Sequence, residues 1–218
     1  MSTLSLILGE SGSGKTASLR NLDPKNTLLI QSIKKPLSFK GDGWGHISST
    51  NKAGNILVSD NTDEIIGFTR KTKRKVIIVD DFQYILSNQF MRRSGETGYQ
   101  KFTDIGVSAW NLFSVLAQLD DDVRVYLLAH TQTDDYGNVK IKTIGKMLDD
   151  KITLEGMVTI CLRAIVEGGE HYFATKNSGS DTVKAPIGMF ENDRVENDLA
   201  RVDALICSYF NINQQAAV

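Results

Sequence analysis

The 218-residue sequence predicts an α/β fold, with a mainly parallel central sheet flanked by helices and a β-hairpin region near the C-terminus. Apolar runs without polar alternation recur at 3–8, 75–79 and 123–129, as in strands that are buried on both faces of a sheet. Segments with helical spacing of apolar residues lie between or after these runs. Each run ends in a glycine-rich or polar cluster, at the position where open α/β sheets bind ligands.

The composition fits a single domain over residues 1–218 that is long enough to bury a full core. Because 41% of the residues are apolar and no apolar run has bilayer length, we expect a cytoplasmic protein without a signal peptide or an added assembly segment. Cys161 and Cys207 lie in apolar segments and are expected to be reduced core thiols. The formal net charge of −1 gives no general attraction to nucleic acid, so any nucleic-acid surface would be local.

The strand at 3–8 leads directly into a glycine-rich loop at 9–16, GESGSGKT, and a helical segment is expected at 17–22. Such a loop directs backbone N–H groups and the positive helix end toward phosphate oxygens, which indicates a bound nucleoside triphosphate rather than a chance match. We expect Lys15 to reach the outer phosphates and the Thr16 hydroxyl to ligate Mg²⁺. The other predicted nucleotide contacts in the loop are Gly9, Ser11, Gly12, Ser13 and Gly14.

A second strand is expected at 27–31, and a third at 75–79 ends in Asp80 and Asp81. An acidic residue at the carboxyl end of such a strand lies beside the phosphate loop and can hold Mg²⁺ through water. Asp80 is therefore the predicted metal partner, and Asp81 is a second carboxylate within reach. The alternative, that two aspartates merely end a strand, has more weight for Asp81 than for Asp80.

A polar stretch at 88–102 follows this strand and combines cations and aromatic residues with flexible glycines. Cations can pair with the phosphates of a single strand while an aromatic ring stacks on its bases. A solvated loop explains the composition equally well. The candidate DNA-binding residues in this stretch are Arg92, Arg93, Tyr99 and Lys101.

The next buried strand, at 123–129, is followed by His130 and Gln132, either of which could sense the terminal phosphate or the attacking water. A solvent-exposed strand end is the alternative. The segment at 131–151 begins here, so ATP could order it and hydrolysis could release it. Its lysines include the candidate DNA contacts Lys140 and Lys142, together with Lys146 and Lys151. A helix between the strands at 75–79 and 123–129 is expected to pack on the sheet through Ile105, Ala109, Leu112 and Leu116.

Two further strands are expected at 159–166 and 171–175, joined by a hairpin turn at 167–170, EGGE. An amphipathic helix then closes the chain, and core packing explains it more simply than an assembly surface does. Its predicted apolar face consists of Val195, Leu199, Val202, Ile206 and Tyr209.

The order of these parts resembles the RecA-like P-loop ATPase core, and within it the short phage proteins that act as ATP-dependent single-strand annealing recombinases. The resemblance covers nearly the whole chain. GESGSGKT and VIIVDD, at 76–81, are shared by many NTPases. The segments at 142–156 and 173–191 are more specific to the phage group, and the pair Arg92–Arg93 and LLAHTQ at 127–132 complete the pattern.

This resemblance implies Mg²⁺-dependent ATP hydrolysis and ATP-dependent binding of single-stranded DNA in homologous recombination or annealing. It implies that the stretches carrying Arg92, Arg93, Lys101, Lys140 and Lys142 are the two DNA-binding loops. It also implies a homo-oligomer, a ring or a short filament, in which Lys176 reaches the nucleotide of the neighbouring subunit; a surface lysine is the alternative. A single-strand-binding protein could cooperate, and the cytoplasm would be that of a bacterial host.

One departure from the RecA pattern concerns the catalytic base. RecA relatives carry a glutamate near the end of the strand at 27–31, whereas this strand ends in Gln31 and Ser32. Asp81 is the first candidate for the base and Glu10 the second, which predicts a weak or DNA-stimulated ATPase. Together with Lys15, His130 and Lys176 they form the predicted catalytic set. The competing functions are an ATPase that remodels or loads replication proteins without DNA affinity and, less favoured, a small-molecule kinase.

Overall fold

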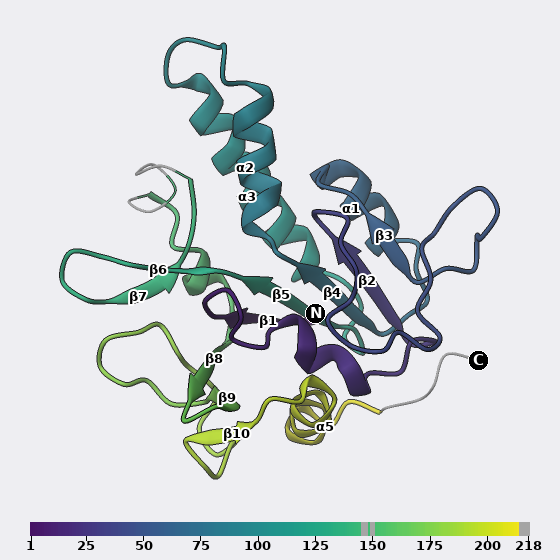
Figure 1. Cartoon of the computed structure of the whole chain (residues 1–218), viewed down its shortest axis with the longest axis vertical. Helices are drawn as coiled ribbons and strands as arrows, with labels where there is room; N and C mark the ends of the chain where they lie inside the picture. Colours follow the sequence, from purple (N-terminus) through teal and green to yellow (C-terminus); the bar gives the residue numbers. More distant parts are fainter. Residues whose placement is uncertain (145–147, 149–150, 214–218) are drawn as a thin grey trace.

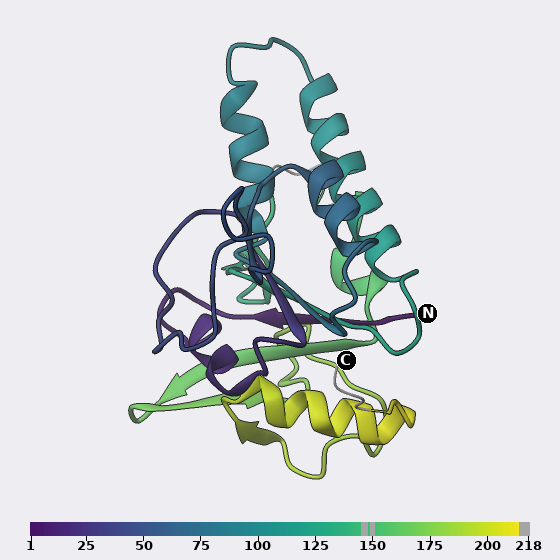
Figure 2. The same cartoon turned by 90° about the vertical axis from the view of Figure 1, so that its right-hand side faces the viewer.

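The computed structural model describes residues 1–144, 148 and 151–213, and in this part a central sheet lies between two layers of helices (Figures 1 and 2). The strands of the sheet are β1 (Thr3–Leu8), β2 (Thr27–Gln31), β3 (Ile56–Val58), β4 (Val76–Asp80), β5 (Arg124–Ala129), β8 (Ile160–Glu167), β9 (Glu170–Ala174) and β10 (Arg194–Glu196). Their order is β10-β9-β8-β1-β5-β4-β2-β3. All neighbours from β8 to β3 run parallel, whereas β9 is antiparallel to both β8 and β10.

The central strands are buried on both faces, which confirms the prediction made from their unbroken apolar runs. In β4, Ile77 and Val79 pack into the core under one helical layer, and Ile78 packs into the core under the other. The alternation of side chains along each strand therefore divides the interior into two cores.

Two layers of helices cover the sheet (Figure 2). α1 (Thr62–Thr69), α2 (Gln83–Arg92) and α3 (Gln100–Leu116) cover one face, and the 3₁₀ helix η1 (Thr16–Asn21) and α5 (Leu199–Phe210) cover the other; a second 3₁₀ helix, η2 (Leu154–Met157), contacts α3. As predicted, α3 buries Ile105, Ala109, Leu112 and Leu116. In the described part of the chain, no helix combines the length and the apolarity needed to cross a membrane.

The helical segment behind the glycine-rich loop is shorter and tighter than a regular α-helix. It forms the six-residue 3₁₀ helix η1, and the chain is already extended at Leu22. Pro24 accounts for the early end, because proline lacks an N–H donor and disfavours a helical conformation at the residue before it. The loop is therefore held mainly by tertiary contacts rather than by a long helix.

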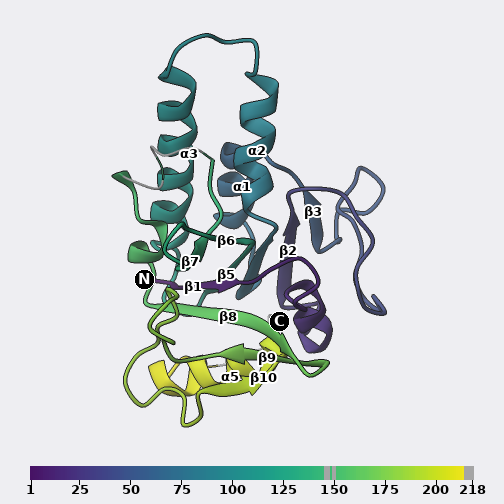
Figure 3. The same ribbon diagram turned by 60° about the vertical axis from the view of Figure 1, so that its left-hand side comes forward.

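The polar stretch at 88–102 forms the far end of a helical hairpin rather than an irregular loop. α2 and α3 project beyond the sheet, and the connection at 93–99 forms the tip (Figure 3). The far half of the hairpin has no sheet to cover, so its helices lack the apolar period that marks a packed helix. Phe90 and Phe102 stack on each other there, with their ring centroids 5.6 Å apart.

The C-terminal region differs from the prediction because Val195 lies in β10 and not in the last helix. Asp198 caps the N-terminus of α5, which begins at Leu199, because its side chain accepts a hydrogen bond from the backbone N–H of Ala200. Leu199, Val202 and Ile206 are buried as expected, whereas Tyr209 is 41% exposed. The hairpin turn between β8 and β9 is confirmed, and both its glycines have positive φ, 62° and 85°.

A separate two-stranded sheet, β6 (Thr131–Thr133) and β7 (Val139–Ile141), follows β5 directly. Its turn is held by Asp134, which accepts hydrogen bonds from the backbone N–H groups of Tyr136 and Asn138. The predicted element at 131–151 thus begins as a hairpin. Lys146 lies outside the described residues, as does part of the 142–156 segment.

Candidate functional site

The glycine-rich loop connects the carboxyl end of β1 to η1, and its backbone conformation requires glycine. Gly12 and Gly14 have φ values of +81° and +93°, in the left-handed region. A Cβ on Gly14 would lie 2.9 Å from Nδ1 of His171. A Cβ on Gly9 would lie 2.8 Å from the carbonyl oxygen of Ala164. The loop is therefore closely packed against the β8–β9 hairpin.

Lys15 is buried beneath this loop. Its Nζ donates hydrogen bonds to the carbonyl oxygens of Gly9 and Glu10, both at 2.8 Å. Burial lowers the pKa of Lys15 to about 8, although the nearby charges of Asp81 and Asp80 act in the opposite direction. These contacts hold the ammonium against the loop, where a phosphate bound by the backbone N–H groups would meet it.

Thr16 faces the carboxyl end of β4. Its hydroxyl oxygen lies 3.2 and 3.0 Å from the two carboxylate oxygens of Asp80, whose side chain is fully buried. Burial raises the pKa of Asp80, and the Asp81 charge adds to this rise, while Lys35 and Thr16 oppose it. A hydroxyl and a carboxylate are hard oxygen ligands of the kind that Mg²⁺ prefers.

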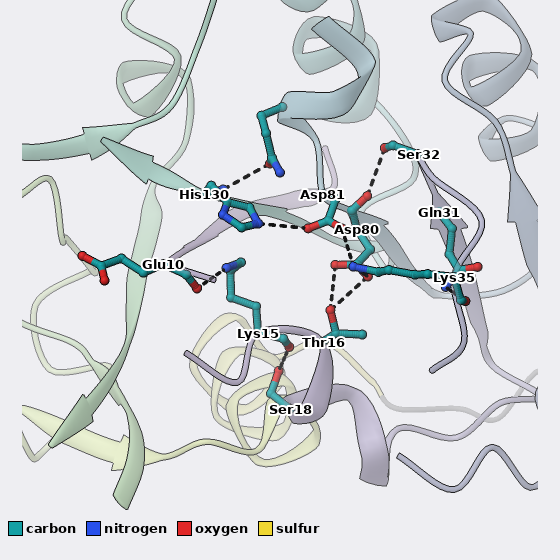
Figure 4. A network of polar contacts seen from close by, with 11 residues as sticks. Glu10, Lys15, Thr16, Ser18, Gln31, Ser32, Lys35, Asp80, Asp81 and His130 are labelled. Carbon is teal, nitrogen blue, oxygen red and sulfur yellow. Dashed lines mark hydrogen bonds and ion pairs between the residues drawn. The ribbon is translucent and has the colours of Figure 1, made fainter. Parts of the chain in front are cut away.

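Asp81 has an unusual backbone conformation, with φ +59°, and its carboxylate has two cationic or polar neighbours (Figure 4). Nε2 of His130 lies 3.5 Å from one carboxylate oxygen, and the Lys35 ammonium forms an ion pair with the other. Burial acts to raise the pKa of Asp81, but the contacts with His130 and Lys35 outweigh it and lower that pKa to about 2. Asp81 is thus firmly ionised in this arrangement.

Lys35 and His171 belong to the site although the sequence did not single them out. Lys35 lies beyond the carboxyl end of β2. The predicted site residues lie in the same way beyond the carboxyl ends of other strands of the sheet. Burial acts to lower the pKa of Lys35, but Asp80 and Asp81 outweigh it, so that pKa is raised. Nδ1 of His171 lies 3.1 Å from the carbonyl oxygen of Ser13 across 158 residues of chain, a contact without any local signal.

These residues surround a single cavity of about 430 Å³, a size typical of small-molecule sites. The cavity is lined by Ser11, Gly12, Gly14, Lys15, Thr16, Ala17, Ile33, Lys35, Ser38, Asp81, Tyr84, His130 and His171. The cavity therefore brings Asp81 and His130 together with part of the predicted loop, namely Ser11, Gly12, Gly14, Lys15 and Thr16. Gly9, Ser13 and Asp80 do not line it.

Glu10, Gln132 and Lys176 are predicted nucleotide-site residues that do not line this cavity. The carboxylate of Glu10 points away from Asp80 and Asp81 (Figure 4), so Glu10 is poorly placed as a base for a reaction in the cavity. Gln132 lies in the β6–β7 hairpin opposite Lys140. Lys176 forms an ion pair with Asp193 and is more than half exposed.

The predicted DNA-binding cations of the helical hairpin contact groups of the chain itself. Arg92 lies 2.8 Å from a carboxylate oxygen of Asp60. Arg93 pairs with both Glu96 and Asp104 at the tip, at 2.7 and 2.8 Å. Lys101 is only 8% exposed, and its ammonium donates to the Glu96 carbonyl oxygen at 2.8 Å and lies over the Phe90 and Phe102 rings. In contrast, Tyr99 is 86% exposed.

The second predicted DNA-binding element is connected to the cavity through its backbone. The N–H of Lys142 donates a 2.8 Å hydrogen bond to the carbonyl oxygen of His130, which extends the β6–β7 hairpin back to the end of β5. The backbone N–H of His130 in turn donates to the side chain of Gln83 at the start of α2. His130 therefore links the cavity wall to both projecting elements.

The residues present fit a magnesium-bound nucleoside triphosphate. Gly12 leaves open space above the loop backbone, and Lys15, Thr16 and Asp80 converge below it. In the described ranges, no group of three or more His, Cys, Asp or Glu side chains could hold a metal ion by itself. A divalent cation held by Thr16 and Asp80 would thus need further oxygen ligands, which phosphates and water provide.

No protein-family model matches the chain, and no curated protein matches it. Among solved structures, the flagellar accessory protein FlaH from Methanocaldococcus jannaschii is similar, with a TM-score of 0.39 and 15% sequence identity. The match covers 78% of this chain and 75% of that one. A likeness of this size is too weak to assign a family or a function.

Proposed function

We propose that this protein is a P-loop ATPase that binds Mg-ATP in the cavity and uses it to control binding of single-stranded DNA, in homologous recombination or annealing. The observation that carries the nucleotide part is the convergence of Lys15, Thr16 and Asp80 beneath a loop with two left-handed glycines. Backbone N–H groups, an ammonium and a pair of hard oxygen ligands are the components that phosphoryl transfer requires.

In the proposed reaction, water attacks the terminal phosphorus in line with the leaving diphosphate. Lys15 would stabilise the charge that develops on the phosphate oxygens, and Mg²⁺ held by Thr16 and Asp80 would supply further positive charge. Asp81 and His130 line the same cavity and are the candidates to orient the water. Because the contact with His130 acts to lower the pKa of Asp81, Asp81 would be a weak base. A weak base at this position would make ATP hydrolysis slow.

The proposed coupling to DNA is supported by where the two projecting elements begin. α2 starts two residues after Asp81, and the β6–β7 hairpin starts directly after His130. A change at the terminal phosphate could therefore be passed to both elements through the backbone. The exposed Tyr99, together with Lys140 and Lys142, would contact a single strand by stacking and by charge.

A second candidate function is an ATPase that remodels a protein complex without intrinsic DNA affinity. The observation that favours it is the internal pairing of Arg92, Arg93 and Lys101, which leaves exposed Met91 and Tyr99 as prominent features of the hairpin end. Aromatic residues and methionine are enriched in protein interfaces.

Binding of a fluorescent oligonucleotide separates these functions. It is measured for single-stranded and duplex DNA with ATP, a non-hydrolysable analogue, ADP or no nucleotide. We expect tight single-strand binding only with a triphosphate, and loss of this dependence in Lys15→Ala. If no DNA binds in any state while a fluorescent ATP analogue still binds, the protein-remodelling function is favoured. If the ATP analogue does not bind either, the nucleotide proposal is wrong.

A further inference from the structure

The loop that leaves β2 brings a second lysine into the cavity. The ammonium of Lys35 forms an ion pair with Asp81 and lies 3.6 Å from Oδ2 of Asp80 (Figure 4). The neighbouring Lys34 is exposed and forms no ion pair among the residues that the structure describes. The position of the Lys35 charge is therefore specific to this residue and is not a general property of the loop.

The two adjacent carboxylates need positive charge, because Asp80 is fully buried and Asp81 is 6% exposed. Lys15 donates its hydrogen bonds to the loop carbonyls of Gly9 and Glu10, so its charge acts on the two carboxylates without a direct hydrogen bond to them. Lys35 supplies the charge to both carboxylates, and its flexible stem allows the ammonium to move.

The same oxygen atoms are the candidates to hold Mg²⁺. Oδ2 of Asp80 accepts the Thr16 hydroxyl at 3.0 Å, and the Lys35 ammonium lies 3.6 Å from the same oxygen. A divalent cation and an ammonium cannot both occupy the space in front of this carboxylate, because their charges repel and their contact positions overlap.

We propose that Lys35 is an internal cation that closes the metal position in the nucleotide-free protein and is displaced when Mg²⁺ arrives with ATP. The inference rests on the proposed nucleotide site. Free Mg²⁺ must compete with Lys35 for the two carboxylates. A triphosphate changes the balance because it offers the released ammonium new anionic partners in the cavity that Lys35 already lines. The site thereby prefers the metal–nucleotide pair over the metal alone.

The test measures metal binding in the absence of nucleotide, with Mn²⁺ as the probe and the EPR signal of free Mn²⁺ as the readout. Wild type should bind Mn²⁺ weakly, and Lys35→Met should bind it at least about tenfold more tightly, because the competing charge is gone. Lys34→Met is the matched control and should behave as wild type. Adding Asp80→Asn to Lys35→Met should abolish the gain. Equal Mn²⁺ affinity in wild type and Lys35→Met would overturn the proposal.

Lys35→Met could fold poorly without a metal, so a second measurement uses the wild-type protein. Its lysines are ¹³C-methylated, and the Lys35 signal is assigned by its absence in Lys35→Arg. This signal should shift with Mg-ATP and stay in place with the same concentration of Mg²⁺ alone. An unchanged Lys35 signal in the presence of bound ATP would contradict the displacement. Binding of a fluorescent ATP analogue is followed in parallel, so that a failure of the nucleotide site is recognised separately.

Discussion

At the scale of single residues, the phosphate loop depends on glycines for two different reasons. Gly12 and Gly14 share a left-handed backbone, but a Cβ on Gly12 would meet nothing within 4 Å. A Cβ on Gly14 would collide with His171 and would also lie 3.1 Å from the side chain of Asn197. The first glycine is needed for conformation alone, and the second is needed for conformation and for space.

This difference predicts that Gly14→Ala destabilises the nucleotide-free protein more than Gly12→Ala does. Both variants carry a backbone cost of about 1–2 kcal/mol for alanine in the left-handed region. Gly14→Ala should lose more stability than Gly12→Ala, because His171 must move to make room for the added Cβ. The free energy of unfolding in urea measures both variants, and adding His171→Ala should narrow the gap between them. Equal losses would show that the contact with His171 is unimportant.

At the scale of elements, a buried polar cluster connects β5 to α5. Arg124 donates two hydrogen bonds to Asp203, at 2.9 and 3.0 Å, and the Tyr126 hydroxyl donates a third at 2.6 Å. All three residues are buried. Burial raises the pKa of Tyr126 well above 10, and the Asp203 charge adds to the rise.

The cluster predicts a loss of stability at high pH. The unfolded chain releases the Tyr126 proton near pH 10, whereas the folded protein retains it. The contribution of Tyr126 to the free energy of unfolding is therefore complete below about pH 10 and decreases as the pH rises above that value. Tyr126→Phe should lower the free energy of unfolding by about 1.5–3 kcal/mol at neutral pH, the typical worth of a hydrogen bond to a charged group, and should lack this alkaline component. Urea unfolding of both proteins measures the difference in their free energies of unfolding, which should be smaller at about pH 11 than at about pH 8. An equal difference at both pH values would contradict the prediction.

The helical hairpin supports a second prediction at this scale. If its cations contact DNA phosphates, Arg92→Ala with Arg93→Ala should weaken DNA binding and reduce its salt dependence by about one unit of slope for each lost contact. The two arginines are paired with Asp60, Glu96 and Asp104, so these ion pairs would have to open. Oligonucleotide binding across a salt series measures this. An unchanged affinity and slope would show that the hairpin is no phosphate-contacting surface.

The sequence predicted those elements whose pattern arises from burial in the sheet. β1, β4 and β5 were found because both faces of each strand are apolar. The far end of the α2–α3 hairpin, at 88–102, was mistaken for a loop because it packs on itself and not on the sheet. Lys35 and His171 were missed for another reason. Their roles depend on contacts across 46 and 158 residues, and such contacts leave no local pattern.

At the scale of the whole molecule, the candidate site draws on most of the sheet. The phosphate loop, Lys35, Asp81, His130 and His171 follow or begin five different strands, β1, β2, β4, β5 and β9. Lys176, like Glu10, is a predicted catalytic residue that does not line the cavity of its own chain. A role for Lys176 at the nucleotide therefore requires a second copy of the protein.

Subunit mixing tests that role. Lys15→Ala and Lys176→Ala are each expected to have low ATPase activity, the first by loss of the phosphate contact and the second by loss of the contact in trans. A mixture should recover activity at those interfaces that join an intact Lys15 site to an intact Lys176. Native mass spectrometry verifies that mixed assemblies are present. Absence of recovery in a verified mixed assembly would count against the trans role.

The contacts of the phosphate loop also determine when the site can be completed during synthesis. The loop lies near the N-terminus, yet it packs against Ala164, His171 and Asn197, and Arg20 of η1 donates to the carbonyl oxygen of Asn197. β1 itself lies between β5 and β8, both of which emerge from the ribosome much later. The phosphate loop is thus translated well before the residues that enclose it. The apolar β1 strand has no sheet partner until β5 has been made, and ATP could stabilise the enclosed site only after the β8–β9 hairpin has been translated.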